Sequence, residues 1–342
     1  MNVAALLRER VWSASIPVEI SLHSADCSSY EAVPYLVHVP RLSYLAFLLP
    51  KLHTYFHANL IYPDVSPFDA WLEYDHVPLK WHYPLGLLYD LYSGAEPASS
   101  HNTPAEQAIV PSSEEEETPP WKLTLHFSSY PKDQLVQLDA HEKHLHDLFI
   151  NNVKEADYLR NGTGKTVMSL SKEDSEQLWE GVRQRDYRRF SRINNKFLNP
   201  QGATLRHVPM RLYLPHAASP QVGKPSSPSS YPQERGKIEK AIMPGSVRVV
   251  QGLIPVSSSS RESLPPELRS ENCADKVLGQ RQTVGTALNT LLPSLFRNTR
   301  GPCLIAAPVL HGAILPLDAG VEDLIRTAAY VDGWLHIAFV ML

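Results

Sequence analysis

The sequence has little of what marks a secreted, membrane-spanning or nucleic-acid-binding protein. Its three cysteines, at positions 27, 273 and 303, are odd in number and far apart, which argues against a disulfide framework and for a reducing compartment. The most apolar stretch, 33–50, is interrupted by His38, Pro40 and Arg41 and is too broken for a membrane span. The formal net charge of −4 gives no reason to expect nucleic acid as a partner. We therefore expect a soluble, cytoplasmic protein.

A secretory signal is also missing, because residues 1–12 carry Arg8, Glu9 and Arg10 after only a brief apolar stretch. This segment predicts a short helix. Proline, by contrast, is abundant, at 29 of 342 residues. Much of it falls in three segments rich in proline, serine or acidic residues that cannot bury enough apolar surface to fold. We predict insertions at about 94–119, 215–240 and 255–280.

The remaining sequence predicts an α+β protein with one pattern of elements occurring twice. The first half predicts strands at 15–22 and 33–39, an amphipathic helix at 42–58 whose first part ends at Pro50, and strands at 70–82 and 121–128. The C-terminal part predicts strands at 205–214 and 246–254, a helix at 284–295, and strands at 303–309 and 334–340, with a short helix at 321–328.

The middle of the chain, 134–199, has helical periodicity instead. Two stripes follow 3.6-residue spacing: Leu145, Leu148, Phe149, Val153, Ala156 and Leu159, then Trp179, Val182, Phe190, Ile193 and Phe197. Burying a large apolar side chain is worth about 1.5–3 kcal/mol, so both stripes must be covered. We expect these helices to pack on each other and on the flanking parts.

The densest aromatic run is 71–92, which reads WLEYDHVPLKWHYPLGLLYDLY. Its composition favours a packed core edge, although such clusters are also typical of protein interfaces. If 79–83 forms a strand, Trp81 and Tyr83 lie on its buried face and the alternating Lys80 and His82 face a partner. The candidate interface residues in this run are Pro78, Lys80, Trp81, His82 and Tyr83.

This run resembles the corresponding segment of the autophagy protein 5 family. Further segments support the resemblance in the family's order: Pro34–Tyr35, Pro40–Leu45, Pro120–Phe127, Val153–Asp157, Gln177–Gly181 and Val208–Tyr213. The resemblance covers most of the chain and implies two ubiquitin-like β-grasp domains flanking a helix-rich domain. The implied domains are residues 1–132, 133–200 and 201–342.

The resemblance also implies a modification site. The segment Val153-Lys154-Glu155-Ala156-Asp157 matches the family's acceptor motif, in which the lysine amine forms an isopeptide bond with the C-terminal glycine of autophagy protein 12. Lys154 lies about 180° from Leu145 on a helical wheel, so we expect it to be exposed. Glu155 and Asp157 join it as interface candidates.

The implied function is that of a scaffold without a nucleophile of its own. The family resemblance implies non-covalent binding of autophagy protein 16, transient contact with the E2-like autophagy proteins 10 and 3, and E3-like promotion of the lipidation of autophagy protein 8 with phosphatidylethanolamine. It also implies peripheral contact with the phagophore membrane. No cofactor or metal is expected, and the chain ends without the C-terminal glycine that a transferable modifier needs.

Three other interpretations stay open. The protein could be an unconjugated β-grasp adaptor that only binds partners. A hydrolase or metal site could use His141, His144 or His146, although Leu145 replaces the second histidine of a zinc-protease helix. The basic series Arg183, Arg185, Arg188, Arg189, Arg192 and Lys196 is explained by a solvated helix face or by attraction to anionic membranes.

Overall fold

A computed structural model describes residues 3–29, 32–93, 119–197, 205–215, 247–258, 280–297, 303 and 305–341. Most of the three predicted insertions lies outside these residues. The third insertion is shorter than predicted, because short strands lie at both of its margins. These strand residues are Pro255, Ser257–Ser258 and Gln280–Arg281. No helix in the described part of the chain is long and apolar enough to cross a membrane.

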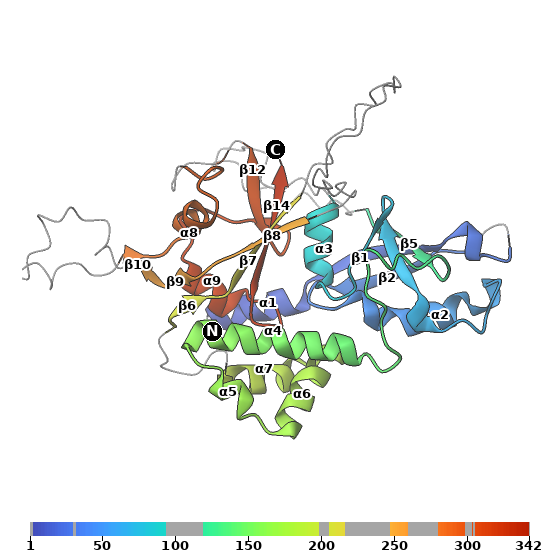
Figure 1. Cartoon of the computed structure of the whole chain (residues 1–342), viewed down its shortest axis with the longest axis horizontal. Helices are drawn as coiled ribbons and strands as arrows, with labels where there is room; N and C mark the ends of the chain where they lie inside the picture. Colours follow the sequence, from blue (N-terminus) through green and yellow to red (C-terminus); the bar gives the residue numbers. More distant parts are fainter. Residues whose placement is uncertain are drawn as a thin grey trace, which may run out of the picture.

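The first unit is a five-stranded mixed sheet covered by helices (Figure 1). Its strands are β1 (Ser15–Leu22), β2 (Tyr35–Pro40), β3 (Trp71–Tyr74), β4 (Val77–Pro78) and β5 (Trp121–His126), in the order β2-β1-β5-β3-β4. Its helices are α1 (Val3–Ser13), α2 (Leu49–Phe56) and α3 (Leu85–Tyr92), with 3₁₀ turns η1 (Ser24–Asp26), η2 (Leu45–Leu48), η3 (His57–Asn59) and η4 (Pro67–Asp69). The central strands β1 and β5 are parallel, and every other pair is antiparallel.

The second sheet repeats this arrangement. Its strands are β7 (Met210–Pro215), β8 (Val247–Gln251), β12 (Ala306–Leu310), β13 (Ala313–Ile314) and β14 (Leu335–Met341), in the order β13-β12-β14-β7-β8. Again the central pair, β14 and β7, is parallel and the outer pairs are antiparallel. Helices α8 (Val284–Leu291) and α9 (Val321–Thr327) and the short strands β6 (His207–Val208), β9 (Ile254–Pro255), β10 (Ser257–Ser258) and β11 (Gln280–Arg281) complete it. The predicted duplication of β-grasp units is confirmed.

Between the two sheets in sequence lies the predicted helical part. It consists of α4 (Lys143–Asn161), α5 (Lys165–Met168), α6 (Lys172–Arg183) and α7 (Tyr187–Phe197). The long helix α4 runs below the second sheet, and α5 to α7 lie on the side of α4 that faces away from this sheet (Figure 1). Five of the six residues in the predicted apolar stripe of α4 pack into the shared core, but the sixth, Leu148, is 42% exposed.

Polar contacts join the two sheet units directly. Helix α3 packs on β14, and its Asp90 forms a buried ion pair with Arg41. The second carboxylate oxygen of Asp90 accepts a hydrogen bond from the Gly312 amide at 3.0 Å, in the turn between β12 and β13. One buried carboxylate thus connects both units.

The prediction of one strand over 70–82 is wrong beyond Pro78. Strands β3 and β4 form a short hairpin, and residues 79–83 then form a turn in which the Tyr83 amide donates to Lys80 O at 3.1 Å. Pro78 and Pro84 bracket this segment and lack the amide hydrogens that a strand would contribute to the sheet.

Candidate functional site

Lys154 lies in the middle of α4, on its solvent-exposed face. The neighbouring turns of the helix bury Phe149, Val153 and Ala156 almost completely. Because these apolar side chains fix the rotation of α4 about its axis, the Lys154 side chain is presented to solvent from a rigid element. The exposure predicted from the helical wheel is therefore observed.

Glu155 anchors α4 to the second sheet. Its carboxylate forms an ion pair with Arg211 Nη2 at 2.7 Å and accepts a hydrogen bond from Gln251 Nε2 at 2.8 Å. Arg211, on β7, also donates to Asn152 Oδ1 at 3.1 Å and stacks over the Trp334 ring at 3.9 Å. The residue next to Lys154 therefore holds two parts of the protein together, with part of its side chain exposed.

The interpretation of Asp157 as an exposed interface residue is wrong. Asp157 is fully buried, because it lies four residues after Val153 on the inner face of α4. Its carboxylate accepts hydrogen bonds from Asn161 Nδ2 at 2.7 Å and from the Val167 amide at 3.2 Å. Burial raises its pKa, and these two hydrogen bonds oppose the shift. Asp157 fixes α5 against the end of α4.

The aromatic segment places its residues differently from the prediction. Trp81 is buried, as predicted, and its indole N–H donates to Val136 O at 2.6 Å. Because 79–83 is a turn, however, His82 is not on an opposite exposed face. Burial, helped by the charge of Lys80, lowers the pKa of His82 to about 4. Lys80 and Pro78 are half-buried.

His82 and Tyr83 line a cavity of about 210 Å³ at the meeting point of three parts of the chain. The first sheet unit contributes Tyr44, His82, Tyr83 and Pro84; α4 contributes Leu145, Leu148, Phe149 and Asn152; and the second unit contributes Arg211, Tyr213, Asp332 and His336. One wall of this cavity is therefore the helix that carries Lys154.

A buried hydrogen-bonded chain lies beside this cavity. Tyr213 Oη and His336 Nδ1 are 2.9 Å apart, and His336 Nε2 is 2.9 Å from Asp332 Oδ2. Burial would raise the pKa of Asp332, but the charge and hydrogen bond of His336 outweigh it and lower the pKa. Burial raises the pKa of Tyr213, so its hydroxyl stays protonated. These hydrogen bonds join β7 to β14 and the turn before it, and so stabilise the second sheet unit.

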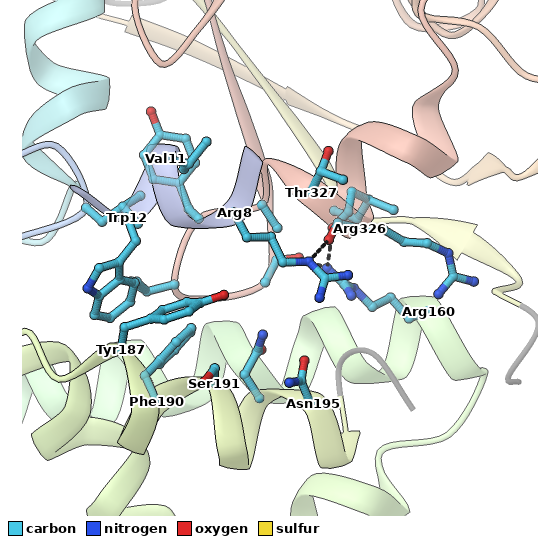
Figure 2. A pocket seen from close by; sticks show the side chains of 17 residues that line it. Arg8, Val11, Trp12, Arg160, Tyr187, Phe190, Ser191, Asn195, Arg326 and Thr327 are labelled. Carbon is cyan, nitrogen blue, oxygen red and sulfur yellow. Dashed lines mark hydrogen bonds between the residues drawn. The ribbon is translucent and has the colours of Figure 1, made fainter. Parts of the chain in front are cut away.

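A second cleft lies where α1, α7 and α9 meet the end of α4, shown in Figure 2. Arg8 of α1 reaches across and donates to Arg326 O at 2.7 Å, while the buried Arg160 donates to Gly333 O at 2.9 Å. On the other side Trp12 stacks on Phe190 at 5.0 Å. The predicted N-terminal helix, α1, thus packs between the helical part and the second sheet unit.

The histidines near the start of α4 contact carboxylates and an aromatic ring. His144 Nδ1 lies 3.5 Å from Asp139, His146 Nδ1 lies 3.7 Å from Asp147, and the His146 ring packs edge-on against Trp179. His141 is exposed. These contacts do not form the nucleophile–base pair that a hydrolase needs.

Comparison with known proteins decides the family. Three consecutive family models match: "Autophagy protein ATG5, UblA domain" over residues 11–127, "alpha-helical bundle region" over 142–200, and "UblB domain" over 207–339. The chain belongs to the autophagy protein 5 family.

Curated relatives agree along the whole length. The chain is 52% identical to autophagy protein 5 of Phaeosphaeria nodorum over 343 residues, covering 100% of this chain and 98% of the relative. It is 43% identical to that of Neosartorya fischeri, covering 100% and 97%. The crystal structure of Kluyveromyces marxianus Atg5 superimposes with a TM-score of 0.66 at 20% identity, covering 98% of this chain and 99% of that one, which shows the shared fold.

In the domain nomenclature of the family, Lys154 lies in the alpha-helical bundle region. The Glu155–Arg211 ion pair connects this region to UblB. Sequence reasoning did not single out Arg211, although it lies in one of the segments that carried the resemblance. It also missed a buried group formed by His23, Asp26 and His126 in UblA. No motif signals that group, since 100 residues separate Asp26 from His126.

Proposed function

We propose that Lys154 is the covalent acceptor for the C-terminal glycine of autophagy protein 12. The observation that carries the proposal is the exposed lysine on a helix whose apolar face lies in the core and which an ion pair fixes to the second ubiquitin-like domain. A fixed helix limits the positions that the acceptor amine can take, which favours a productive approach to a bulky donor.

The reaction needs an external enzyme. An ordinary lysine amine is mostly protonated at neutral pH and must lose a proton before it can attack. The free amine then attacks the thioester carbonyl carbon held by the E2-like autophagy protein 10; the N–C bond forms, the C–S bond breaks, and the thiol leaves with a proton. This chain holds the acceptor amine in place, and the groups that activate the reaction belong to the E2-like enzyme.

The resulting conjugate acts as a scaffold. It binds autophagy protein 16 non-covalently and orients the E2-like autophagy protein 3, so that autophagy protein 8 is transferred to phosphatidylethanolamine. The protein is itself no enzyme in this scheme; it works in the cytoplasm and peripherally at the phagophore membrane. Pro78 and Lys80 are the interface candidates of the aromatic run whose partial exposure supports partner contact.

We also propose the domain limits 1–132, 133–200 and 201–342. The family-model matches begin and end close to these limits, which supports the division.

The test of the acceptor is Lys154→Arg, with Lys143→Arg as the matched control at another exposed lysine of the same helix. Each variant is expressed with the conjugation components, and the products are resolved on a denaturing gel. We expect Lys154→Arg to lose the covalent adduct and Lys143→Arg to keep it. Exposed substitutions of this kind change stability by less than about 0.5 kcal/mol, so thermal melts should coincide.

Mass spectrometry of the tryptic branch peptide identifies the modified lysine. An adduct on Lys143 or Lys165 in the Lys154→Arg protein would refute the assignment. A wild-type protein that forms no adduct but still binds its partners would establish the unconjugated adaptor instead.

A further inference from the structure

We propose that His23, Asp26 and His126 form a binding site for one divalent transition-metal ion of the zinc type. Each residue offers a ligand atom, and these atoms lie within 4.8 Å of one another. Two imidazoles and a carboxylate are a donor set that Zn²⁺ accepts in proteins. The site lies in the first ubiquitin-like domain and is independent of the proposed conjugation.

The topology of the first sheet brings the three residues together. Strands β1 and β5 are parallel neighbours, so their carboxyl ends leave the same edge of the sheet. His126 is the last residue of β5, and His23 follows β1 directly, with its amide donating to Leu125 O at 2.9 Å. Asp26 ends the 3₁₀ turn that follows, and its Oδ2 accepts from the Phe127 amide at 2.9 Å. Backbone contacts therefore fix the group.

Two of the three residues are more buried than the members of an ordinary surface cluster. Asp26 is 7% exposed and His126 is 6% exposed. The buried Nε2 of His126 makes no hydrogen bond with the described residues, and the Glu73 carboxylate is its charged neighbour. Buried ionisable side chains are usually paired with an opposite charge or bound to a metal, and a cation at this place would neutralise the Asp26 carboxylate.

Glu73 on the neighbouring strand β3 occupies the position of an orienting carboxylate. Its Oε2 lies 3.3 Å from His126 Nε2. Metal-binding histidines usually direct their second ring nitrogen at such a carboxylate, which fixes the ring and its tautomer. This leaves Nδ1 of His126 for the metal. The Trp71 ring, stacked on His126 at 4.0 Å, holds the imidazole plane.

Binding requires His23 to turn. The His23 and His126 rings are stacked at 4.3 Å with planes inclined by 28°, so their lone pairs do not yet converge. Ligand atoms around a tetrahedral Zn²⁺ lie about 3.3 Å apart, given bonds of about 2.0 Å. His23 is half-buried and its Nδ1 accepts only a 3.3 Å contact from the Ala25 amide. When His23 binds the metal through Nε2, its ring proton moves to Nδ1. The contact between Nδ1 and the Ala25 amide is then lost.

The test is titration of the chelator-treated full chain with ZnCl₂ by calorimetry, with Co²⁺ absorption as a report on ligand geometry. The variants are His23→Gln and Asp26→Asn; the latter keeps an oxygen for the Phe127 amide. His144→Gln is the control, because His144 also lies beside an aspartate but is 58% exposed. Thermal melts without metal verify that each variant is folded.

We expect one Zn²⁺ per wild-type chain, at least tenfold weaker binding in His23→Gln and Asp26→Asn, and unchanged binding in His144→Gln. Zinc should also raise the melting temperature of the wild type and the control, but not of the two site variants. A wild type that binds no Zn²⁺ would overturn the proposal. So would equal affinity in wild type and His23→Gln, or loss of binding in the His144→Gln control.

Discussion

His82 is held uncharged by its surroundings. Burial lowers its pKa to about 4, whereas an unfolded histidine titrates near 6.5. A group whose folded pKa is depressed contributes stability that is fully present above its unfolded pKa. That contribution is lost as the pH falls through the folded pKa, here between about 6.5 and 4.

We predict that the wild type loses more stability on acidification than His82→Gln does. Between pH 7 and pH 5 the difference should be about 2 kcal/mol in free energy of unfolding, because one imidazole must remain neutral in the folded state only. Urea denaturation at both pH values measures it. His76→Gln is the control, since the His76 side chain is almost fully exposed. A parallel pH dependence in wild type and His82→Gln would contradict the burial of His82.

At the scale of the elements, α4 packs against α5 and β6, and its C-terminal end depends on one glycine. Gly162 has φ +71° and its amide donates to Tyr158 O, which closes the helix. A Cβ at this position would lie 2.5 Å from Arg206 Nη1. The left-handed backbone conformation therefore requires glycine, and an added Cβ would also displace the end of the flexible Arg206 side chain.

We predict that Gly162→Ala destabilises the protein by at least about 1 kcal/mol, from the left-handed conformation alone. Gly164→Ala is the matched control, because it lies two residues away, has no positive φ, and a Cβ there would meet nothing within 4 Å. Urea midpoints of the two variants should separate clearly. If Gly164→Ala were equally destabilised, the effect would not arise from the helix end.

Periodicity predicted the regular elements well and their long-range contacts poorly. The stripe of α4 and the repeated strand order are local signals, so the helix, the two sheets and the exposure of Lys154 could be predicted. The turn at 79–83 was missed because alternation of large and polar residues is equally compatible with a strand. The Glu155–Arg211 ion pair joins residues 56 positions apart, and it exists only because two separately predicted units pack together. The motif match that includes Asp157 carries no information on burial, whereas its position four residues after Val153 places it on the inner face of α4.

On the scale of the whole molecule, a buried ion pair of the first ubiquitin-like domain also contacts the second domain. Asp90 pairs with Arg41, and it also binds the Gly312 amide of the other domain. Burial raises the pKa of Asp90, and the neighbouring Arg41 opposes that shift. Removing the carboxylate would leave the Arg41 guanidinium buried without its counter-charge.

We predict that Asp90→Ala destabilises the protein by about 3–5 kcal/mol, the usual effect of breaking a buried pair from one side. Replacing both partners, as in Arg41→Met with Asp90→Leu, should recover part of this loss, because no uncompensated charge remains. Chemical denaturation measures both, and amide exchange at Gly312 reports the contact between domains. The exposed pair Lys172–Glu176 is the control, and Glu176→Ala should change stability by less than about 0.5 kcal/mol.

The position of β14 has a consequence for the order in which the protein forms during synthesis. This strand lies in the centre of the second sheet, between β12 and β7, yet it comprises residues 335–341. The first sheet has all its strands once residue 126 has left the ribosome, whereas the second cannot close until residue 341 has emerged, more than 200 residues later. The Trp334 indole, which donates to Asn152 O at 3.0 Å, also arrives last. The helix that carries Lys154 therefore reaches its final packing only after Trp334 and β14 have been synthesised.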